Sequence, residues 1–192
     1  MEIVILIIGL VYSIVFHELA HGYIAEKLGD YTPRYAGRLT LNPLAHLDPI
    51  GSFLLPLITY LTGGFLIGWA KPVPINPYNF EKPERDMALV AIAGPLTNIV
   101  VAIILAAIYK LFYFSGIFLE PILPLIRLNL LLAVFNLIPI PPLDGSRVFL
   151  KNLDPQTLMF LEQFGFFFIF IFIYFAFPFL NSLVDYLFHL LI

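Results

Sequence analysis

Residues 17–21 of this chain, His-Glu-Leu-Ala-His, have the residue types and the spacing to place a metal ion beside a proton acceptor. Two histidines four residues apart lie one above the other on a helix face, so both imidazoles can reach one metal ion. Glu18 lies beside them and can take a proton from a water molecule that the metal activates. The pattern therefore predicts metal-assisted hydrolysis, with His17 and His21 as ligands and Glu18 as the base.

The segment that carries this motif is apolar enough to lie in a membrane. Residues 3–16, IVILIIGLVYSIVF, carry no charge, and the segment 2–26 is long enough to span a bilayer. Ionisable groups at bilayer depth are costly and usually functional. H-E-x-x-H on a helix is also the zinc-binding motif of metallopeptidases. A histidine pair that is merely solvated or packed is the ordinary alternative, but the membrane setting favours a site for one zinc ion per chain.

The composition indicates a polytopic membrane protein. Of the 192 residues, 60% are hydrophobic and 12% are charged, and the mean hydropathy is +0.94. An average soluble domain has about 25% charged residues. The net charge of −3 gives no support for a nucleic-acid partner, and the absence of cysteine excludes thiolate catalysis and cysteine-based zinc sites. No stretch is polar enough to form a separate soluble domain, so residues 1–192 are expected to form a single domain.

The expected fold class is an all-α polytopic membrane protein. About four helices are expected to span the bilayer, over residues 2–26, 86–113, 122–138 and 156–177. Residues 179–192, after Pro178, are too short to span and are expected to form a short C-terminal helix. Residues 50–69 are apolar, but Pro56 and Gly63-Gly64 interrupt them.

A catalytic zinc site usually has three protein ligands, so a third ligand is needed. Asp144 is the strongest candidate, because the prolines in 139–142 end the preceding helix and Gly145 gives the turn freedom. Unwound backbone at membrane depth is tolerated where it lines a wet cavity, which a water-using site would provide. His46 and Asp48 are rival ligands, although residues of a proline-rich loop are more often structural.

The basic residues predict the topology. Eight of the ten Lys and Arg residues lie in three expected loops, 27–49, 70–85 and 145–155. These loops are therefore expected on the cytoplasmic side, and the loop 114–121 on the outer side. The helix 2–26 then runs inward, and His17 and His21 would lie roughly 8–14 Å from its inner end. The active site is thus expected toward the cytoplasmic leaflet of the cell membrane.

This topology constrains the apolar segment 50–69. If these residues crossed the membrane completely, Asp144 would lie on the opposite side from His21. The segment is therefore predicted to be re-entrant, entering and leaving on the inner face, and its proline and glycine breaks agree with this. The alternative is an ordinary span combined with a different third ligand.

Three motifs, in order, resemble those of the site-2 protease family of intramembrane zinc metallopeptidases. They are HELAH at 17–21, GPLTN at 94–98 and NLIPIPPLDG at 136–145. LNPLAHLDPIG at 41–51 and GWAKPVPIN at 68–76 further resemble the short bacterial and archaeal branch, and no PDZ or CBS-type domain is expected. The resemblance covers residues 1 to about 155. It implies that His17, His21 and Asp144 bind zinc, that Glu18 is the catalytic base, and that substrates are cleaved within or beside their own transmembrane helices.

Peptide hydrolysis also needs a hydrogen-bond donor for the oxyanion, and Asn98 and Asn136 are both candidates. The alternatives are helix packing for Asn98 and capping of the broken helix for Asn136. An unwound substrate could pair with a short edge strand near the inner face, at residues 68–76 or 37–41.

These predictions together indicate a zinc-dependent endopeptidase whose partners are membrane-protein substrate helices and the lipid bilayer. The alternative functions are a metal transporter that uses the same ligands and a scaffold that binds helices without cutting them. The intact Glu18 argues against both, because neither transport nor scaffolding needs a base beside the ligands.

Overall fold

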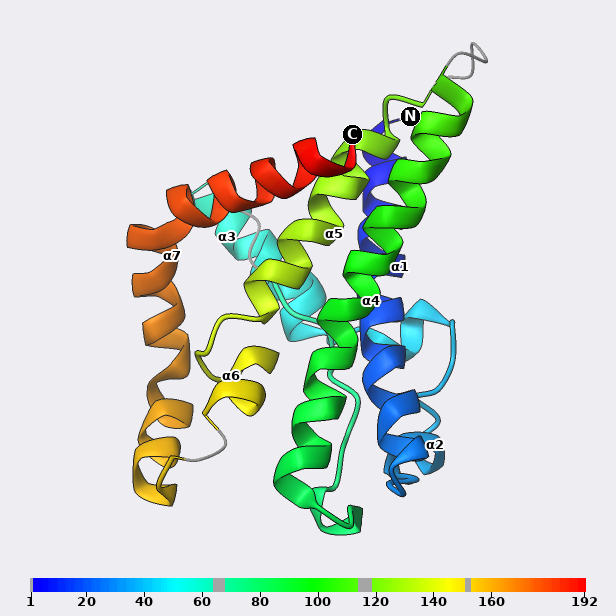
Figure 1. Cartoon of the computed structure of the whole chain (residues 1–192). Helices are drawn as coiled ribbons and strands as arrows, with labels where there is room; N and C mark the ends of the chain where they lie inside the picture. The colour runs from blue at the N-terminus through cyan, green and yellow to red at the C-terminus, as the bar shows by residue number, and fades with distance from the viewer. Residues whose placement is uncertain (1, 64–67, 114–118, 151–152) are drawn as a thin grey trace.

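The computed structural model describes residues 2–63, 68–113, 119–150 and 153–192 (Figure 1). The long helices are α1 (Glu2–Lys27), α4 (Pro83–Phe112), α5 (Ile122–Asn136) and α7 (Pro155–Leu191). The short helices are α2 (Thr32–Tyr35), α3 (Leu55–Gly63) and α6 (Asp144–Phe149), with 3₁₀ turns at Pro43–His46 and Pro77–Asn79 and a π-helical turn at Ile50–Leu54. Residues 64–67, 114–118 and 151–152 belong to the predicted re-entrant segment and to two predicted loops, and they lie outside the described residues.

Three of the described helices are long and apolar enough to cross a membrane: Ile3–Lys27, Pro83–Phe112 and Met159–Leu191. The predicted all-α class is therefore confirmed for the described residues, and these three helices agree with the predicted membrane location. Helix α5 is also apolar, but its 15 residues extend about 22 Å, which is less than the hydrocarbon core of about 30 Å. The expectation of about four spans stays a prediction as far as α5 is concerned.

Helices α1, α4 and α5 lie side by side, with α4 packed against both of the others (Figure 1). The core between α4 and α5 is built from small residues on one side, Ala102 and Ala106, and from branched residues on the other, Ile126 and Leu130. Small residues let helix backbones approach closely, which matters where lipid removes the hydrophobic drive for association. The close packing of α4 against its two neighbours positions the candidate site.

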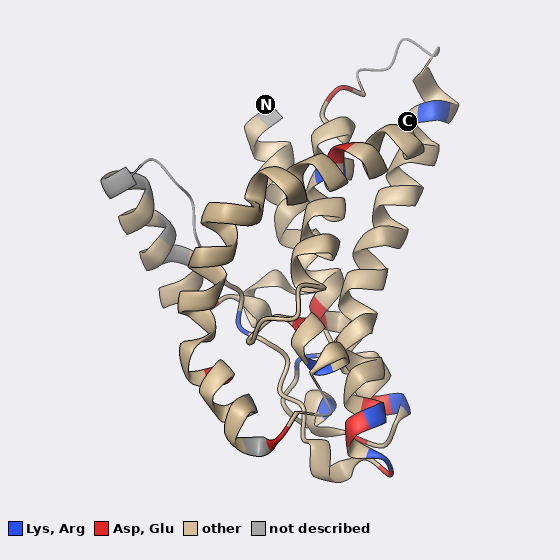
Figure 2. Cartoon of the chain, turned by 60° about the vertical axis from the view of Figure 1, so that its left-hand side comes forward, with Lys and Arg blue, Asp and Glu red and all other residues tan. Residues whose placement is uncertain are grey.

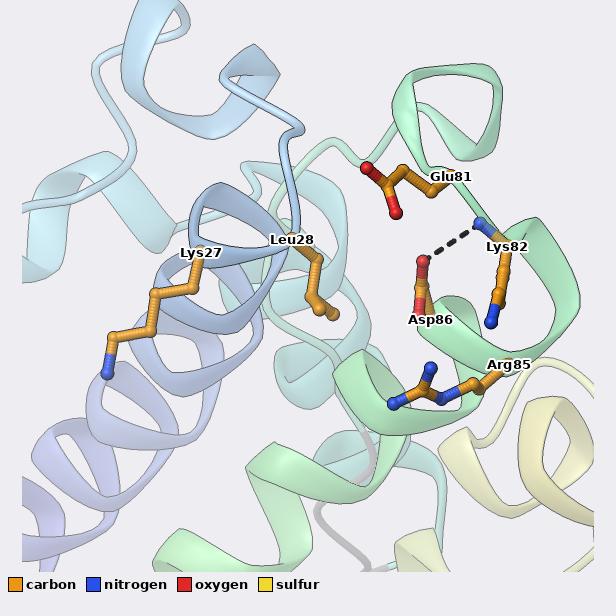
Figure 3. Close-up of a pocket in the computed structure, with 6 residues that line it drawn as sticks. All are labelled: Lys27, Leu28, Glu81, Lys82, Arg85 and Asp86. Carbon is orange, nitrogen blue, oxygen red and sulfur yellow. Dashed lines mark hydrogen bonds between the residues drawn. The ribbon is translucent and has the colours of Figure 1, made fainter.

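Charged residues cluster around the start of α4 at one end of the molecule, a smaller number lie toward the opposite end, and long stretches of helix carry none (Figure 2). A polar pocket lies there, where α1 ends and α4 begins (Figure 3). The Lys82 backbone N–H donates to Asp86 Oδ2 at 3.0 Å in this pocket, which caps the first turn of α4. The gathering of charge at one end is what the predicted topology requires, and the orientation in the cell stays a prediction.

The two ends of the apolar segment 50–69 meet. The Trp69 N–H donates to Gly51 O at 3.0 Å, and the Ser52 hydroxyl donates to Trp69 O at 3.0 Å. The contact requires a glycine, because a Cβ at position 51 would lie 2.3 Å from the Trp69 indole nitrogen. The chain thus returns to the point from which α3 departs, which is the geometry that a re-entrant segment needs.

The predicted edge strands are absent from the described part of the chain. Residues 37–41 form a turn and bends, and residues 69–76 are extended but pair with no strand. Val73 N–H donates to Glu18 Oε2 instead. Prolines at 72 and 74 have no N–H to donate, so this stretch cannot make a continuous ladder of backbone hydrogen bonds.

The C-terminal residues do not form a separate helix, contrary to the prediction. Helix α7 continues through Pro178 to Leu191, and its ribbon bends between the orange and red parts in Figure 1. A proline removes one backbone hydrogen bond and kinks a helix, but the helix continues if packing holds the next turn. Here Leu180 and Val184 are buried against the core, and Asp185 pairs with Arg127 of α5 at 2.8 Å.

Candidate metal centre

His17, His21 and Asp144 converge on one point. Asp144 Oδ2 lies 3.0 Å from His17 Nε2 and 3.3 Å from His21 Nε2. One ligand atom from each of the three residues lies within 4.8 Å of the others, and across the described residues this is the group of His, Asp and Glu that could hold a metal ion. The structure therefore brings together the three residues that the sequence predicts as ligands, from α1 and from the start of α6.

The centre is enclosed by the helices and opens on the Asp144 side. The side chains of His17 and His21 are 10% and 8% exposed, whereas the Asp144 side chain is 21% exposed. A mostly enclosed site with one open side suits a metal that must keep a position for water or substrate.

The second nitrogen of each ring has its own hydrogen-bond partner. His21 Nδ1 donates to Val90 O at 2.8 Å, and His17 Nδ1 lies 2.5 Å from Asn98 Oδ1. A backbone carbonyl can only accept, so His21 Nδ1 carries its proton and Nε2 presents a lone pair in the neutral ring. Metal-ligating histidines almost always make such a bond through their other nitrogen.

These donors fit a zinc ion. Two imidazole nitrogens and one carboxylate oxygen face one another, and their lone pairs repel at such short range unless a metal ion or a proton lies between them. A two-histidine, one-carboxylate set is a known composition of catalytic zinc sites. His17 Nε2, His21 Nε2 and a carboxylate oxygen of Asp144 would hold the ion.

Asp144 reaches this point because the chain turns sharply after α5. The residues after Asn136 fold back so closely that a Cβ at Gly145 would lie 2.2 Å from Leu137 O. Asn136 itself is the last residue of α5, and its side-chain amide donates to Leu132 O at 2.9 Å, one turn back in its own helix. Asn136 is thus near Asp144 in the chain, and its role as an oxyanion donor stays a prediction.

Asn98, the other candidate oxyanion donor, lies inside the protein. It is fully buried, its Oδ1 faces His17 Nδ1, and its Nδ2 donates to Asn129 Oδ1 at 3.0 Å and to Ser13 O at 3.3 Å. The amide contacts the ring nitrogen that is turned away from Asp144. In this structure Asn98 is therefore a partner of a ligand, and its N–H groups are already engaged.

Glu18 is half-buried, and one of its carboxylate oxygens accepts a hydrogen bond from Val73 N–H at 2.8 Å. The extended residues 69–76 thus run past the predicted base. Arg38 stabilises this stretch through hydrogen bonds. Its guanidinium is buried and donates to Ala45 O, to Lys71 O at 2.6 Å and to Pro72 O at 2.8 Å. In the sequence Arg38 is only a loop charge, and nothing there indicates this structural role.

The rival ligands lie elsewhere. His46 is buried, and its Nε2 donates to Thr40 O at 2.9 Å. Asp48 Oδ1 accepts from the N–H groups of Ile50 and Gly51 and starts the π-helical turn. Neither residue belongs to the metal-binding group, so both have the structural role that was the alternative.

Comparison with known proteins gives relatives but no structural template. No protein-family model matches the chain, and no solved structure matches it. The Bacillus subtilis protein named "Putative zinc metalloprotease YwhC" is 43% identical over 159 residues, which cover 78% of this chain and 69% of YwhC. This chain belongs to the same family as YwhC.

Other members of the YwhC family come from distant organisms. Rip2 of Mycolicibacterium smegmatis is 32% identical over 168 residues, which are 85% of this chain and 64% of Rip2. MJ0611 of Methanocaldococcus jannaschii is 34% identical over 147 residues, which are 72% of this chain and 65% of MJ0611. Both carry zinc metalloprotease names, and this chain spans about two thirds of the length of these relatives. Membership of the family supports a zinc protease function.

Proposed function

We propose that this protein is a zinc-dependent intramembrane endopeptidase of the site-2 protease type, with one zinc ion per chain. The observation that carries the proposal is the convergence of His17, His21 and Asp144 beside Glu18, with both histidines on a helix apolar enough to cross a membrane. A transporter or a scaffold would have no need of the glutamate next to the ligands.

Several residues of the chain have separate roles in the proposed reaction. Zinc, when bound, supplies Lewis acidity toward the scissile carbonyl and acidifies the attacking water. Glu18 accepts the proton from that water and passes it to the leaving amine. The hydrogen bond from Val73 N–H holds one oxygen of Glu18 in place, which leaves the other oxygen for proton transfer. Asn136 donates to the developing oxyanion after a change of side-chain rotamer, since its amide contacts Leu132 O in this structure.

The proposed substrates are transmembrane helices of other proteins in the cell membrane. A helix hides its peptide bonds, so the substrate must be extended before it is cut. The stretch 69–76 supports this step, because it is extended, runs past Glu18 and has no strand partner in the described chain. The charged end of the molecule supports an active site toward the cytoplasmic leaflet (Figure 2).

Zinc stoichiometry of the detergent-purified protein tests the metal site. We expect about one zinc per chain in the wild type, in Glu18→Gln and in His46→Ala, and loss of zinc in Asp144→Ala. His46→Ala is the matched control, because it removes a buried histidine that lies outside the metal group. Zinc retained in Asp144→Ala would refute the ligand set.

Co-expression with a panel of single-span membrane proteins tests the cleavage. Mass spectrometry of the products should place the cut within or beside the apolar segment of the substrate. Glu18→Gln should give no product while it keeps its zinc. Cleavage by Glu18→Gln at the wild-type rate would exclude Glu18 as the base, and a metal-loaded wild type that cuts no panel member would favour transport or scaffolding.

A further inference from the structure

Behind the metal centre, a chain of buried amide groups connects His17 to α5. Asn98 of α4 and Asn129 of α5 are both fully buried and lie in contact, with Asn98 Nδ2 donating to Asn129 Oδ1 at 3.0 Å. Asn129 belongs to none of the sequence motifs described above. It is noticeable in the sequence only as a polar residue inside an apolar helix. Burying a polar side chain among apolar helices costs free energy, so the presence of Asn129 calls for a structural or functional explanation.

The directions of these hydrogen bonds follow from backbone groups. Asn129 Nδ2 lies 2.9 Å from Leu125 O, and a carbonyl can only accept, so the NH₂ end of Asn129 faces Leu125 and its oxygen faces Asn98. The same NH₂ group donates to Ser13 Oγ at 2.9 Å, while the Ser13 hydroxyl donates to Gly9 O at 2.7 Å. Every group in this part of the chain therefore has a complementary partner.

This order continues to the metal ligand. Because Asn129 Oδ1 accepts, Asn98 must direct its NH₂ group toward α5 and its oxygen toward His17. The oxygen then accepts the proton of His17 Nδ1, and Nε2 is left with the lone pair that a metal needs. If Asn98 turned over, its NH₂ group would face Nδ1, and the proton of the neutral ring would move to Nε2.

We infer that Asn129 is a positioning residue for the metal centre: through Asn98 it selects the tautomer of His17 that can bind the ion. The inference rests on the proposed zinc site and deepens it. Asn129 touches neither the ligand nitrogens nor the substrate, so its effect must pass through Asn98. The Ser13 backbone carbonyl also accepts a hydrogen bond from the Asn98 NH₂ group and so favours the same orientation of Asn98, but this contact is longer, at 3.3 Å.

The experiment is a double-mutant cycle on zinc affinity, measured with a competing chromophoric chelator in detergent. Asn129→Leu removes the amide and keeps the number of heavy atoms and the branching of the side chain. We expect it to weaken zinc binding about 10- to 100-fold, the usual range for residues that orient a ligand. Asn98→Leu should have an effect at least as large. Because Asn129 acts through Asn98, adding Asn129→Leu to Asn98→Leu should weaken binding no further.

Ile126→Val is the matched control, since Ile126 is fully buried on the same helix and contributes only packing. It should lower the melting temperature and leave zinc affinity unchanged. Asn129→Ala carries the same expectation as Asn129→Leu and provides a second variant if the leucine is poorly accommodated.

Several results would overturn the inference. They are an unchanged zinc affinity in Asn129→Leu and Asn129→Ala, an equal further loss in the Asn98→Leu background, and failure of both Asn129 variants to fold where Asn98→Leu folds. These results are distinct from failure of the proposed function, in which the wild type and Ile126→Val would themselves bind no zinc.

Discussion

Gly94 lies directly against His17: a Cβ at position 94 would be 2.6 Å from His17 Nε2, the nitrogen that faces Asp144. The same Cβ would lie 2.5 Å from His21 Nε2. The missing side chain therefore lets α4 lie against both ligand nitrogens. This explains why the GPLTN motif begins with glycine, which the sequence alone leaves open.

Gly94→Ala should consequently weaken zinc binding. Overpacking of this kind costs about 1–3 kcal/mol, which corresponds to about a 5- to 150-fold loss of affinity if the cost falls on the zinc-bound state. Zinc affinity measured by chelator competition checks it. Ile126→Val is the control, because it changes the buried packing between α4 and α5 at a residue outside the metal-binding group, and it should keep wild-type zinc affinity. Equal affinities in Gly94→Ala and wild type would contradict the observed packing.

Zinc should also stabilise the folded protein. An ion that binds only the native state adds stability that grows with the logarithm of its concentration, about 2.7 kcal/mol at 100 times the dissociation constant. Removal of zinc with a chelator should lower the melting temperature in detergent, and added zinc should restore it. Asp144→Ala should show no zinc-dependent shift, whereas Asp48→Ala should respond as the wild type does. A zinc-dependent shift in Asp144→Ala would place the ion elsewhere.

Arg38 should matter for stability more than its place in a loop suggests. Arg38→Met leaves the carbonyl groups of Lys71 and Pro72 without their buried donor, and we expect a loss of about 2–4 kcal/mol in the free energy of unfolding. Proteolytic activity should fall as well, because the same stretch donates Val73 N–H to Glu18. Arg34→Met is the control. Arg34 is exposed and pairs with Glu26 at the surface, so its loss should leave the melting temperature unchanged.

Asp30 should make stability depend on acidic pH. Burial alone would raise the pKa of this carboxyl, but hydrogen bonds from Thr32, Asn76 and Asn79 outweigh it and lower the pKa below its ordinary value. The ionised form is thus favoured in the folded state. Its contribution is complete above the unfolded pKa of about 3.9 and is lost as the pH falls through the lower folded pKa.

Unfolding in detergent between pH 3 and pH 7 measures this dependence. Asp30→Asn should be less stable than the wild type at pH 7, and the difference should shrink toward pH 3. A constant difference between Asp30→Asn and the wild type across this range would contradict the lowered pKa.

The chemistry of the centre could be predicted from the sequence because it depends on local spacing and on membrane energetics. His17 and His21 are one helical turn apart in any helix, and Glu18 lies beside them. Asp144 is predictable as the third ligand because it follows a proline-broken helix, and the basic loops place it in the same leaflet as His21 if residues 50–69 are re-entrant. The meeting of Gly51 with Trp69 agrees with the re-entrant path on which that argument depends.

The expectations that failed depended on packing between distant parts of the chain. Pro178 predicts the end of a helix, but α7 continues beyond it because Leu180 and Val184 are buried against the core. The sequence predicts an edge strand at residues 68–76, but the Val73 N–H donates to the Glu18 carboxylate instead of to a neighbouring strand.

By itself, the sequence determined an apolar helical protein and the identities of the side chains that could hold a metal ion, because periodicity and hydrophobicity act over short distances along the chain. Only the tertiary structure decided which nitrogen of each histidine faces Asp144. That choice depends on Asn98 and Val90, both of α4, and on Asn129 of α5, residues far from the histidines in sequence. A hydrogen bond of defined direction needs two groups at a defined distance, and helix packing alone sets that distance.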